Sequence, residues 1–454
     1  MTAALLTSTK PPEQDGPVAS PRSSCAVRLV AWCTSLGLLI LFVVLDVVPS
    51  AKRPNTAGFA TLYAESRILI EAPHDLYRVY DDGWFQPQID RSFDSQVREI
   101  AHGQPPTMSL ILSPLAWLSP RNARLAWIPI SALLWFAGIW TLSIGLGLPR
   151  VQGMAPVVWL SSAGTAYRPI AENLRRGQGY ALMFFFLSVA IAILLRLDRR
   201  RWSTVGVVLA SMFLLKSAGL WLLLLMVVAR QWRVVGGAAI AGLAMILVCS
   251  PFMGWGIWLI YGRDAVAWMA NPSNYVTAYQ TIRGLTGHLL IFDPVWNPKP
   301  VANLPALARV LAIGLSAGAL AVTAAFHRLD SDLHADRALT FGMCVSLMVA
   351  ASPVAEGYHY VLVFPAVVIA WWWAASSHAS FSTLLLLAGS TGLLCVPQSY
   401  YGSVHIRDGW AALLAYPLLY GAVGLWAFFV HALATSPLTI SAQPIERRNR
   451  AAVG

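Results

Sequence analysis

The chain has 454 residues, of which 57% are hydrophobic and only 12% are charged, and its formal net charge is +11. Soluble domains carry about a quarter charged residues, so this composition excludes a set of soluble domains and predicts an integral membrane protein. The basic excess does not indicate nucleic-acid binding, because the basic residues stand at the ends of apolar runs, as cytoplasmic anchors of membrane spans do. The five cysteines show no paired spacing and predict neither a disulfide framework nor a metal site.

The N-terminal segment, residues 1–26, is rich in Pro, Ser and Thr and lacks apolar periodicity. We expect it to be a disordered cytoplasmic tail. The first apolar run, at about 29–48, is too long for the apolar region of a typical signal peptide and predicts a retained membrane span. Arg22 and Arg28 precede this run and place the N-terminus in the cytoplasm.

A long polar stretch follows at 50–123 and holds most of the carboxylates. We interpret it as an external loop. Inside it, residues 105–118 are apolar but too few to cross about 30 Å of hydrocarbon. They are typical of an interfacial or re-entrant helix. This interpretation decides on which side of the membrane each later loop lies.

Nine further apolar runs have a length or composition typical of membrane spans. They lie at about 124–146, 153–166, 178–195, 234–256, 306–326, 338–353, 359–375, 380–396 and 411–433.

Residues 203–229 are apolar, but both ends are basic and Lys216 interrupts the middle. A single span would bury Lys216 near the centre of the bilayer, which costs several kcal/mol. Two short helices with Lys216 at an external turn avoid this cost. We therefore predict two short helices.

Together these elements predict an all-α polytopic membrane protein with about twelve spans and no internal repeat. The transmembrane domain covers 27–434, a second external loop covers 257–305, and 435–454 form a cytoplasmic tail. Both termini are then cytoplasmic, and both long loops lie outside. Long loops are uncommon unless they are functional, so we expect the active face to be external.

Eight basic side chains are expected on that external face, although membrane proteins usually carry their excess of Lys and Arg on the cytoplasmic side. They are Arg67, Arg78, Arg168, Arg175, Arg176, Lys216, Arg263 and Arg283. Any single one is explained by contact with lipid headgroups. As a group they indicate a binding site for an anion, most simply a phosphate held by charge-assisted hydrogen bonds.

Four patterns occur in a fixed order along the chain. They are Gly58-Phe59 with Tyr63 and Leu76-Tyr77; Pro105-Pro106 followed by Ser113-Pro114-Leu115; Asn173 to Gln178 followed by Lys216; and Ser352-Pro353 followed by His359. In this order, over about residues 30–375, they resemble glycosyltransferase family 87 of the GT-C fold.

The resemblance implies a GT-C-like bundle and an enzyme that uses a polyprenyl-phosphate sugar as donor, without a cofactor. The family includes actinobacterial mannosyl- and arabinofuranosyltransferases of the cell envelope. We therefore expect transfer of mannose, or secondly of arabinofuranose, to an envelope glycolipid or glycan. The reaction is expected at the external face of the plasma membrane.

The family's motifs carry over to individual residues. Its N-x-x-x-G-Q pattern matches Asn173, Gly177 and Gln178, and its hairpin lysine matches Lys216, a contact for the donor phosphate. Its loop pattern of an Asn followed by an Arg matches Asn274 and Arg283, and its S-P…H-H-Y pattern matches Ser352, Pro353 and His359, with Tyr358 in place of the first histidine.

Further site residues are expected around these motifs. Arg175 and Arg176 are additional candidates for the donor phosphate, and Tyr63 is a candidate for substrate binding. Asp81-Asp82 is the nearest approach to a metal-binding acidic pair, and we interpret it as a solvated turn, so that no metal is expected.

One position departs from the family, because Gly58 stands where the family has the Asp that is presumed to be the catalytic base. A transfer with inversion needs a base near the acceptor hydroxyl. Asp46, Glu65 and Glu356 are candidates, and Glu356 is three residues before His359, a spacing that puts both on one helical face. Alternatively, no base exists and the protein binds a lipid-linked sugar without turnover. A transporter or flippase of lipid-linked saccharides is the other alternative, although such proteins usually contain internal repeats.

Overall fold

The computed structural model describes residues 25–53, 58–93, 97–148, 154–270, 276–377 and 379–435. Within these ranges the chain is helical throughout and has no β-strand, apart from an isolated bridge between Asp293 and Asn297. The all-α class predicted from the sequence is therefore confirmed. The two predicted tails lie outside the described residues except at their inner edges, where Cys25 begins the first helix and Thr435 ends the last.

The first apolar run forms one long helix with a local irregularity. Helix α1 (Cys25–Phe42) continues through a π-helical turn, η1 (Val43–Val47), into α2 (Val48–Lys52). Asp46 lies inside this turn and is half-buried. A π-helical turn inside an α-helix often marks a functional position, and here it contains the only carboxylate of the span.

The stretch that was predicted as the first external loop is largely helical. Its elements are α3 (Phe59–Glu71), η2 (Pro73–Tyr80), α4 (Asp82–Asp90), η3 (Pro106–Leu110) and η4 (Ser113–Leu115). The segment 105–118 is thus two short 3₁₀ helices instead of one interfacial helix, because its prolines lack the N–H groups that a continuous helix needs. It packs on α3 and α9, and the hydroxyl of Ser66 donates a 2.6 Å hydrogen bond to the carbonyl of Ser109.

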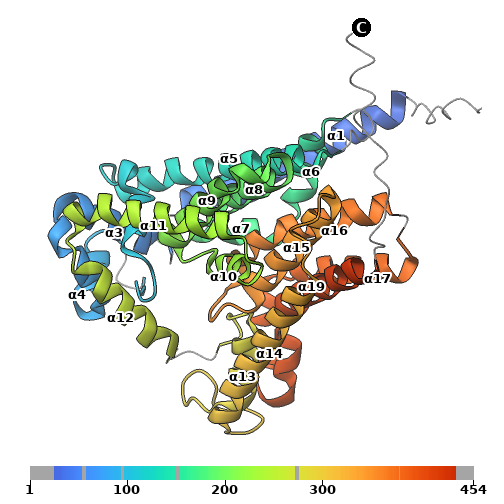
Figure 1. Ribbon diagram of the computed structural model, residues 1–454. Helices are drawn as coiled ribbons and strands as arrows, with labels where there is room; N and C mark the ends of the chain where they lie inside the picture. The colour runs from blue at the N-terminus through green and yellow to red at the C-terminus, as the bar shows by residue number, and fades with distance from the viewer. Residues whose placement is uncertain are drawn as a thin grey trace, which may run out of the picture.

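The middle of the chain forms a row of packed helices. Its elements are α5 (Pro120–Leu146), α6 (Pro156–Thr165), α7 (Arg168–Arg176), α8 (Tyr180–Arg196), η5 (Arg199–Arg201), α9 (Ser203–Lys216), α10 (Leu220–Val228) and α11 (Trp232–Met253). In Figure 1 this row occupies the upper half of the molecule, with α5 on α8 and with α9 between α8 and α11.

The chain breaks at Lys216, as predicted. Lys216 is the last residue of α9, and Ser217 and Gly219 then adopt positive φ angles of 53° and 87° before α10 begins. These left-handed residues end one helix and reverse the chain into the next. The prediction of two short helices is confirmed.

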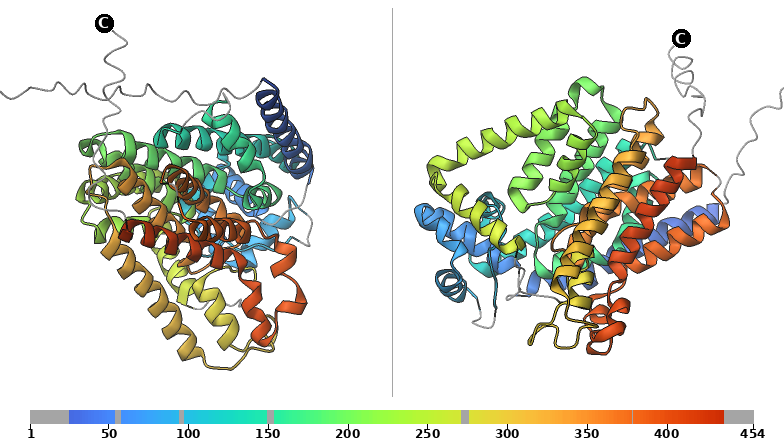
Figure 2. Two further views of the ribbon diagram at one scale, coloured as in Figure 1. Left: turned by 90° about the vertical axis from the view of Figure 1, so that its right-hand side faces the viewer. Right: turned by 60° about the horizontal axis from the view of Figure 1, so that its bottom comes forward.

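Helix α12 (Ile257–Ala270) packs on η2 and η3 of the first loop, and the C-terminal part of the chain forms a second group of helices. The elements of this group are α13 (Ile282–Leu290), α14 (Pro305–Phe326), α15 (His334–Ala350), η6 (Gly357–Val363), α16 (Phe364–Ser376), α17 (Phe381–Leu394), α18 (Gln398–Tyr401), η7 (Val404–Ile406), η8 (Gly409–Ala415) and α19 (Pro417–Thr435). Helices α15 and α17 pack on α19. Figure 2 shows this orange and red group on one side of the molecule, while the blue helices of the first loop lie beside α11 and α12 on the other.

Among the described residues, six helical segments are long and apolar enough to cross a membrane. They are Cys25–Lys52, Pro120–Leu146, Trp232–Met253, Pro305–Phe326, Gly357–Ser376 and Pro417–Thr435, and two shorter apolar helices are Tyr180–Arg196 and Phe381–Leu394. Large apolar side chains project from several of them, such as Ile240 and Ile313, which suits contact with lipid. The count of about twelve spans stays a prediction. The second predicted loop, 257–305, contains helices α12 and α13.

Candidate active site

The N-x-x-x-G-Q motif builds the turn between α7 and α8. Gly177 has a φ of 68°, and the N–H of Gln178 donates a 3.0 Å hydrogen bond to the carbonyl of Asn173. The side-chain oxygen of Asn173 accepts a 3.1 Å hydrogen bond from the N–H of Tyr180, which begins α8. A Cβ at Gly177 would lie 2.7 Å from the Cβ of Phe59. The motif therefore seats the α7–α8 turn directly on the start of α3.

Gly58, which stands where the resemblance implies an aspartate, lies beside this turn. Gly58 precedes α3 with a φ of 92°, and a Cβ at Gly58 would lie 2.3 Å from Nε2 of Gln178. The side chain of Gln178 thus fills the space that a residue with a side chain at 58 would need. A carboxylate is nevertheless present here, because Glu99 accepts a hydrogen bond from the N–H of Gly58 and a 2.6 Å hydrogen bond from the hydroxyl of Thr61.

Lys216 points from the break after α9 into the protein, and its exposed fraction is only 8%. Its Nζ donates a 2.9 Å hydrogen bond to Oε1 of Gln104 and lies 3.1 Å from the sulfur of Met108. The ring centre of Tyr180 is 5.9 Å away. A thioether is a weak acceptor, so within the described part of the chain this buried ammonium has one strong hydrogen-bond acceptor for its three donors.

Two carboxyl groups face Lys216. Glu65, on α3, is only 3% exposed, and its Oε1 has no hydrogen-bond partner among the described residues. Burial raises the pKa of Glu65 to about 8, although the charge of Lys216 opposes this shift. Burial also raises the pKa of Glu99, although the hydrogen bonds from Thr61 and Gly58 and the charge of Lys216 act to lower it. Burial disfavours the ionised form of each acid.

His359 and Glu356 are locked together at the start of η6. The N–H of Glu356 donates a 3.0 Å hydrogen bond to Nδ1 of His359, and the Glu356 side chain accepts from the backbone of His359. The i,i+3 spacing therefore forms a reciprocal helix cap. Glu356 also pairs with Arg176 at 3.2 Å and accepts a 3.2 Å hydrogen bond from the hydroxyl of Tyr358. Because Nδ1 accepts, the proton of neutral His359 is on Nε2.

Tyr180 joins these two groups. The ring of His359 lies 4.4 Å from the ring of Tyr180, which also faces Lys216. The charges of Lys216 and Arg176 both act on His359, and the charge of Glu356 acts on Glu99. Six side chains therefore share one site, which we call the central cluster: Glu65, Glu99, Arg176, Lys216, Glu356 and His359.

Arg175 and Asp46 lie in a different charged group. Successive helical residues differ by about 100° in direction, so Arg175 diverges from Arg176 and faces Asp46, Arg168 and Arg53 instead. The carbonyl of Arg175 accepts a 2.8 Å hydrogen bond from the side chain of Arg124. The structure therefore separates the two adjacent arginines that the sequence suggested for a single phosphate.

Arg283 is half-buried in the first turn of α13, and Asn274 lies outside the described residues. The segment before Arg283 is tied to the chain around the central cluster. The N–H of Gln280 donates a 2.8 Å hydrogen bond to the carbonyl of Ala355, and the hydroxyl of Tyr360 donates to the carbonyl of Gln280. Helix α13 therefore begins next to the segment that carries His359.

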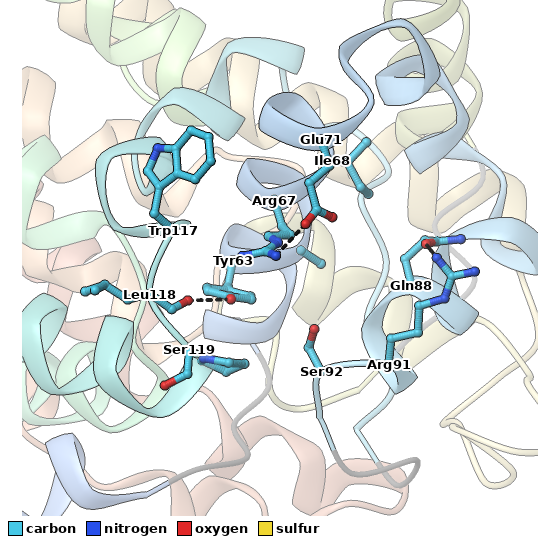
Figure 3. Close-up of a pocket in the computed structure, with 12 residues that line it drawn as sticks. Tyr63, Arg67, Ile68, Glu71, Gln88, Arg91, Ser92, Trp117, Leu118 and Ser119 are labelled. Atoms are coloured by element: carbon cyan, nitrogen blue, oxygen red, sulfur yellow. Dashed lines mark hydrogen bonds and ion pairs between the residues drawn. The ribbon is translucent and has the colours of Figure 1, made fainter.

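A polar pocket of about 400 Å³ opens on the other face of α3 (Figure 3). It is lined by Tyr63, Ala64, Arg67, Ile68, Glu71, Gln88, Arg91, Ser92, Trp117, Leu118, Ser119 and Pro120. Arg67 pairs with Glu71, and the hydroxyl of Tyr63 donates a 2.8 Å hydrogen bond to the carbonyl of Leu118. The ring of Trp117 is 75% exposed and stands across the pocket from Gln88 and Arg91.

The acidic pair of the first loop has structural contacts. The side chain of Asp81 accepts a 3.0 Å hydrogen bond from the N–H of Gly83 and caps α4, and Asp82 lies 3.2 Å from His102. Across the described ranges, no three His, Cys, Asp or Glu side chains converge as metal ligands.

Sequence reasoning missed Glu99, Thr61 and Gln104. Glu99 is 38 positions beyond Thr61, in a polar segment with no motif and no periodicity. Gln104 precedes the Pro105-Pro106 motif, and its side chain holds Lys216. The one available signal for Glu99 was that it is a carboxylate in the stretch that contains Gly58.

Comparison with known proteins gives one match. The family model of glycosyltransferase family 87 matches residues 104–353, just over half of the chain. The match includes Arg176 and Lys216 of the central cluster and stops short of Glu356 and His359. No curated protein and no solved structure matches the chain.

Proposed function

The chain belongs to glycosyltransferase family 87 and is a membrane glycosyltransferase, and from this premise we propose that it takes its sugar from a polyprenyl phosphate. The acceptor is a glycolipid or glycan of the cell envelope. Mannose is our first choice for the sugar and arabinofuranose our second, on the resemblance to actinobacterial members. The family match favours neither the flippase nor the inactive binding protein that were left open as alternatives.

The setting of Lys216 is the observation that carries the proposal. Its ammonium is buried, and no carboxylate of the described chain lies within 4.0 Å of it. A buried charge without a close counter-ion costs free energy, and it is retained where a ligand supplies the missing charge. The phosphate of the donor is such a ligand, because it offers oxygen acceptors to the free N–H groups of Lys216.

The chemistry follows from this contact. The acceptor oxygen forms a bond to the anomeric carbon, and the bond from that carbon to the phosphate oxygen breaks. The polyprenyl phosphate leaves with the electron pair, and Lys216 stabilises its charge. Arg176, which shares the cluster, adds positive charge, and His359 donates a hydrogen bond from Nε2 to the phosphate or to the acceptor.

The remaining predicted residues take supporting parts in the proposal. Asn173 and Gln178 each keep a buried polar atom without a partner in the described chain, Nδ2 and Oε1 respectively, and these atoms are suited to sugar hydroxyl groups. Arg283 and Asn274 are proposed to contact the donor from the α13 side, on the family pattern alone. Arg175 is proposed to meet lipid phosphate beside Asp46, outside the central cluster.

We assign a sugar unit of the acceptor, other than the one whose hydroxyl reacts, to the polar pocket on the open face of α3. Its planar polar side chains, such as Arg67, Gln88 and Arg91, are suited to sugar hydroxyl groups, and the exposed ring of Trp117 is suited to the apolar face of a sugar. Tyr63, predicted as a substrate-binding residue, lines this pocket. We further propose that the site opens to the external face of the plasma membrane and that both termini are cytoplasmic.

The test uses the purified full-length protein in lipid nanodiscs. Polyprenyl-phosphate mannose and polyprenyl-phosphate arabinofuranose, each with a labelled sugar, are supplied together with envelope lipid extracts. We expect a labelled glycolipid or glycan from one of the two donors. If neither donor gives a glycosylated product, the proposed function is wrong.

A further inference from the structure

We infer that Glu99 is the catalytic base of this enzyme and that it replaces, from another part of the chain, the aspartate that is missing at position 58. The inference rests on the proposed function, because it names the residue that takes the acceptor proton in that reaction. Its first support is location. The carboxylate of Glu99 accepts hydrogen bonds from the N–H of Gly58 and the hydroxyl of Thr61, so it lies at the position that the sequence leaves without an acid.

The surroundings of Gly58 explain why the acid comes from elsewhere. A Cβ at this position would lie 2.3 Å from the amide nitrogen of Gln178, and the φ of 92° is strained for any residue except glycine. An aspartate at 58 would therefore displace Gln178. With glycine there, Gln178 keeps its place, and the backbone N–H of Gly58 is bonded to Glu99.

Contacts and access together separate Glu99 from the other candidate bases. Glu99 is half-buried and part of its surface is open, whereas Glu65 is only 3% exposed. Glu356 is held by Arg176, Tyr358 and the helix cap, and Asp46 lies in the other charged group. Among these carboxylates, Glu99 alone combines contact with Gly58, membership of the central cluster and an open side.

The charges around Glu99 suit a base. Lys216 on α9 and Arg176 on α7 attract its ionised form, while Glu65 on α3 and Glu356 on η6 repel it. The start of α3 also favours an anion. Burial outweighs these favourable contacts and raises the pKa of Glu99 above that of an ordinary glutamate. A raised pKa makes the carboxylate a stronger acceptor of the hydroxyl proton.

The proton balance of the step is simple. As the acceptor oxygen bonds to the anomeric carbon, its proton passes to the carboxylate of Glu99, and the polyprenyl phosphate leaves as an anion beside Lys216. Glu99 then returns the proton to water. No oxidant, reductant or further reactant is needed.

The test separates a base from a helix cap by comparing Glu99→Gln with Glu99→Ala in the full-length protein. Glutamine keeps an oxygen that can accept from Gly58 and Thr61, but its amide does not take the proton. We expect E99Q to fold, to bind polyprenyl phosphate as the wild type does, and to lose about 10²–10⁴-fold in kcat. Asp75→Asn removes a carboxylate from the partly exposed η2 of the same stretch and is expected to keep wild-type kcat.

The pH profile adds a second readout. Wild-type activity should fall as the pH drops through the raised pKa of Glu99, and this acidic limb should vanish in E99Q. If Glu99 only capped α3, E99Q would be active and E99A would be unstable, which overturns the inference. Should E99Q fail to fold, Glu99→Asp decides, because a base displaced by one methylene should cost about 10²-fold in kcat, and an unchanged kcat would contradict the assignment.

The two proposals fail in different ways. If the wild type transfers sugar and E99Q is fully active, Glu99 is not the base, and the proposed function still holds. No transfer by the wild type from any polyprenyl-phosphate sugar rejects the function and the base together.

Discussion

The two faces of α3 carry similar side chains in opposite settings. Thr61 and Glu65 face the central cluster, where Glu65 is buried with an unpartnered oxygen and has Lys216 beyond ion-pairing distance. Tyr63, Arg67 and Glu71 face the open pocket, where Arg67 and Glu71 pair directly beside solvent. A solvated ion pair contributes little free energy, whereas charges kept buried and apart are costly. The contrast supports our proposal that the chemistry takes place on the buried face of α3 and recognition on the open one.

Among the substitutions that test this contrast, removing the charge of Lys216 should have the largest effect on activity. Lys216→Met keeps the length of the side chain but removes the ammonium that stabilises the departing phosphate, so that only Arg176 of the central cluster still supplies positive charge. We expect kcat to fall about 10²–10³-fold, as when a stabilising donor is removed from an enzyme site, and the affinity for polyprenyl phosphate to fall with it. Steady-state kinetics with labelled donor measures both. A folded K216M variant with wild-type kcat would break the phosphate assignment.

Glu65→Gln should change stability in a pH-dependent way. The pKa of Glu65 is raised in the folded protein to about 8, so the folded state holds a proton that the unfolded state loses at lower pH. The wild type is therefore destabilised as the pH rises from the ordinary glutamate range to about 8, by at most about 1.4 kcal/mol per pH unit.

Thermal unfolding in detergent at pH 5 to 9 tests this expectation. The melting temperature of E65Q should exceed that of the wild type by an amount that grows up to about pH 8 and is then constant. A difference that does not change with pH would mean that Glu65 is not held neutral by burial.

Trp117→Ala should have the smallest effect, and that effect should be limited to binding of the acceptor. Loss of the exposed ring is expected to raise the KM for the acceptor about tenfold, equivalent to about 1.4 kcal/mol, with the KM for the donor unchanged. Initial rates at varied acceptor and donor concentrations separate the two. A raised donor KM would show that the open pocket does not act on the acceptor alone.

The sequence predicted the break at Lys216 because a charge in the middle of an apolar run is too costly to leave in the bilayer centre. It also paired Glu356 with His359, although the contact is a reciprocal helix cap in which Glu356 lies just outside the helix instead of sharing a helical face with His359. Both inferences concern residues that are close in the sequence, and interactions over such short separations can be predicted from a single sequence.

The rest depended on contacts between distant segments. Glu99 meets Gly58 across a polar stretch that has no apolar pattern to fix its path. Arg175 and Arg176 are neighbours in sequence, and only the phase of α7 decides which of them faces Glu356. The sequence predicted residues 50–123 as a polar external loop with one interfacial helix, because its helices are short and some contain proline, whereas the structure packs them against α9 and α11.

The most direct test of the account measures binding of polyprenyl phosphate, the leaving product, to the wild type, to Lys216→Met and to Arg67→Met in nanodiscs. The account predicts that K216M loses at least tenfold in affinity, while R67M binds polyprenyl phosphate as the wild type does and loses affinity only for the acceptor. Equal losses in both variants, or unchanged binding by K216M, would contradict the assignment of the donor phosphate to the buried side of α3.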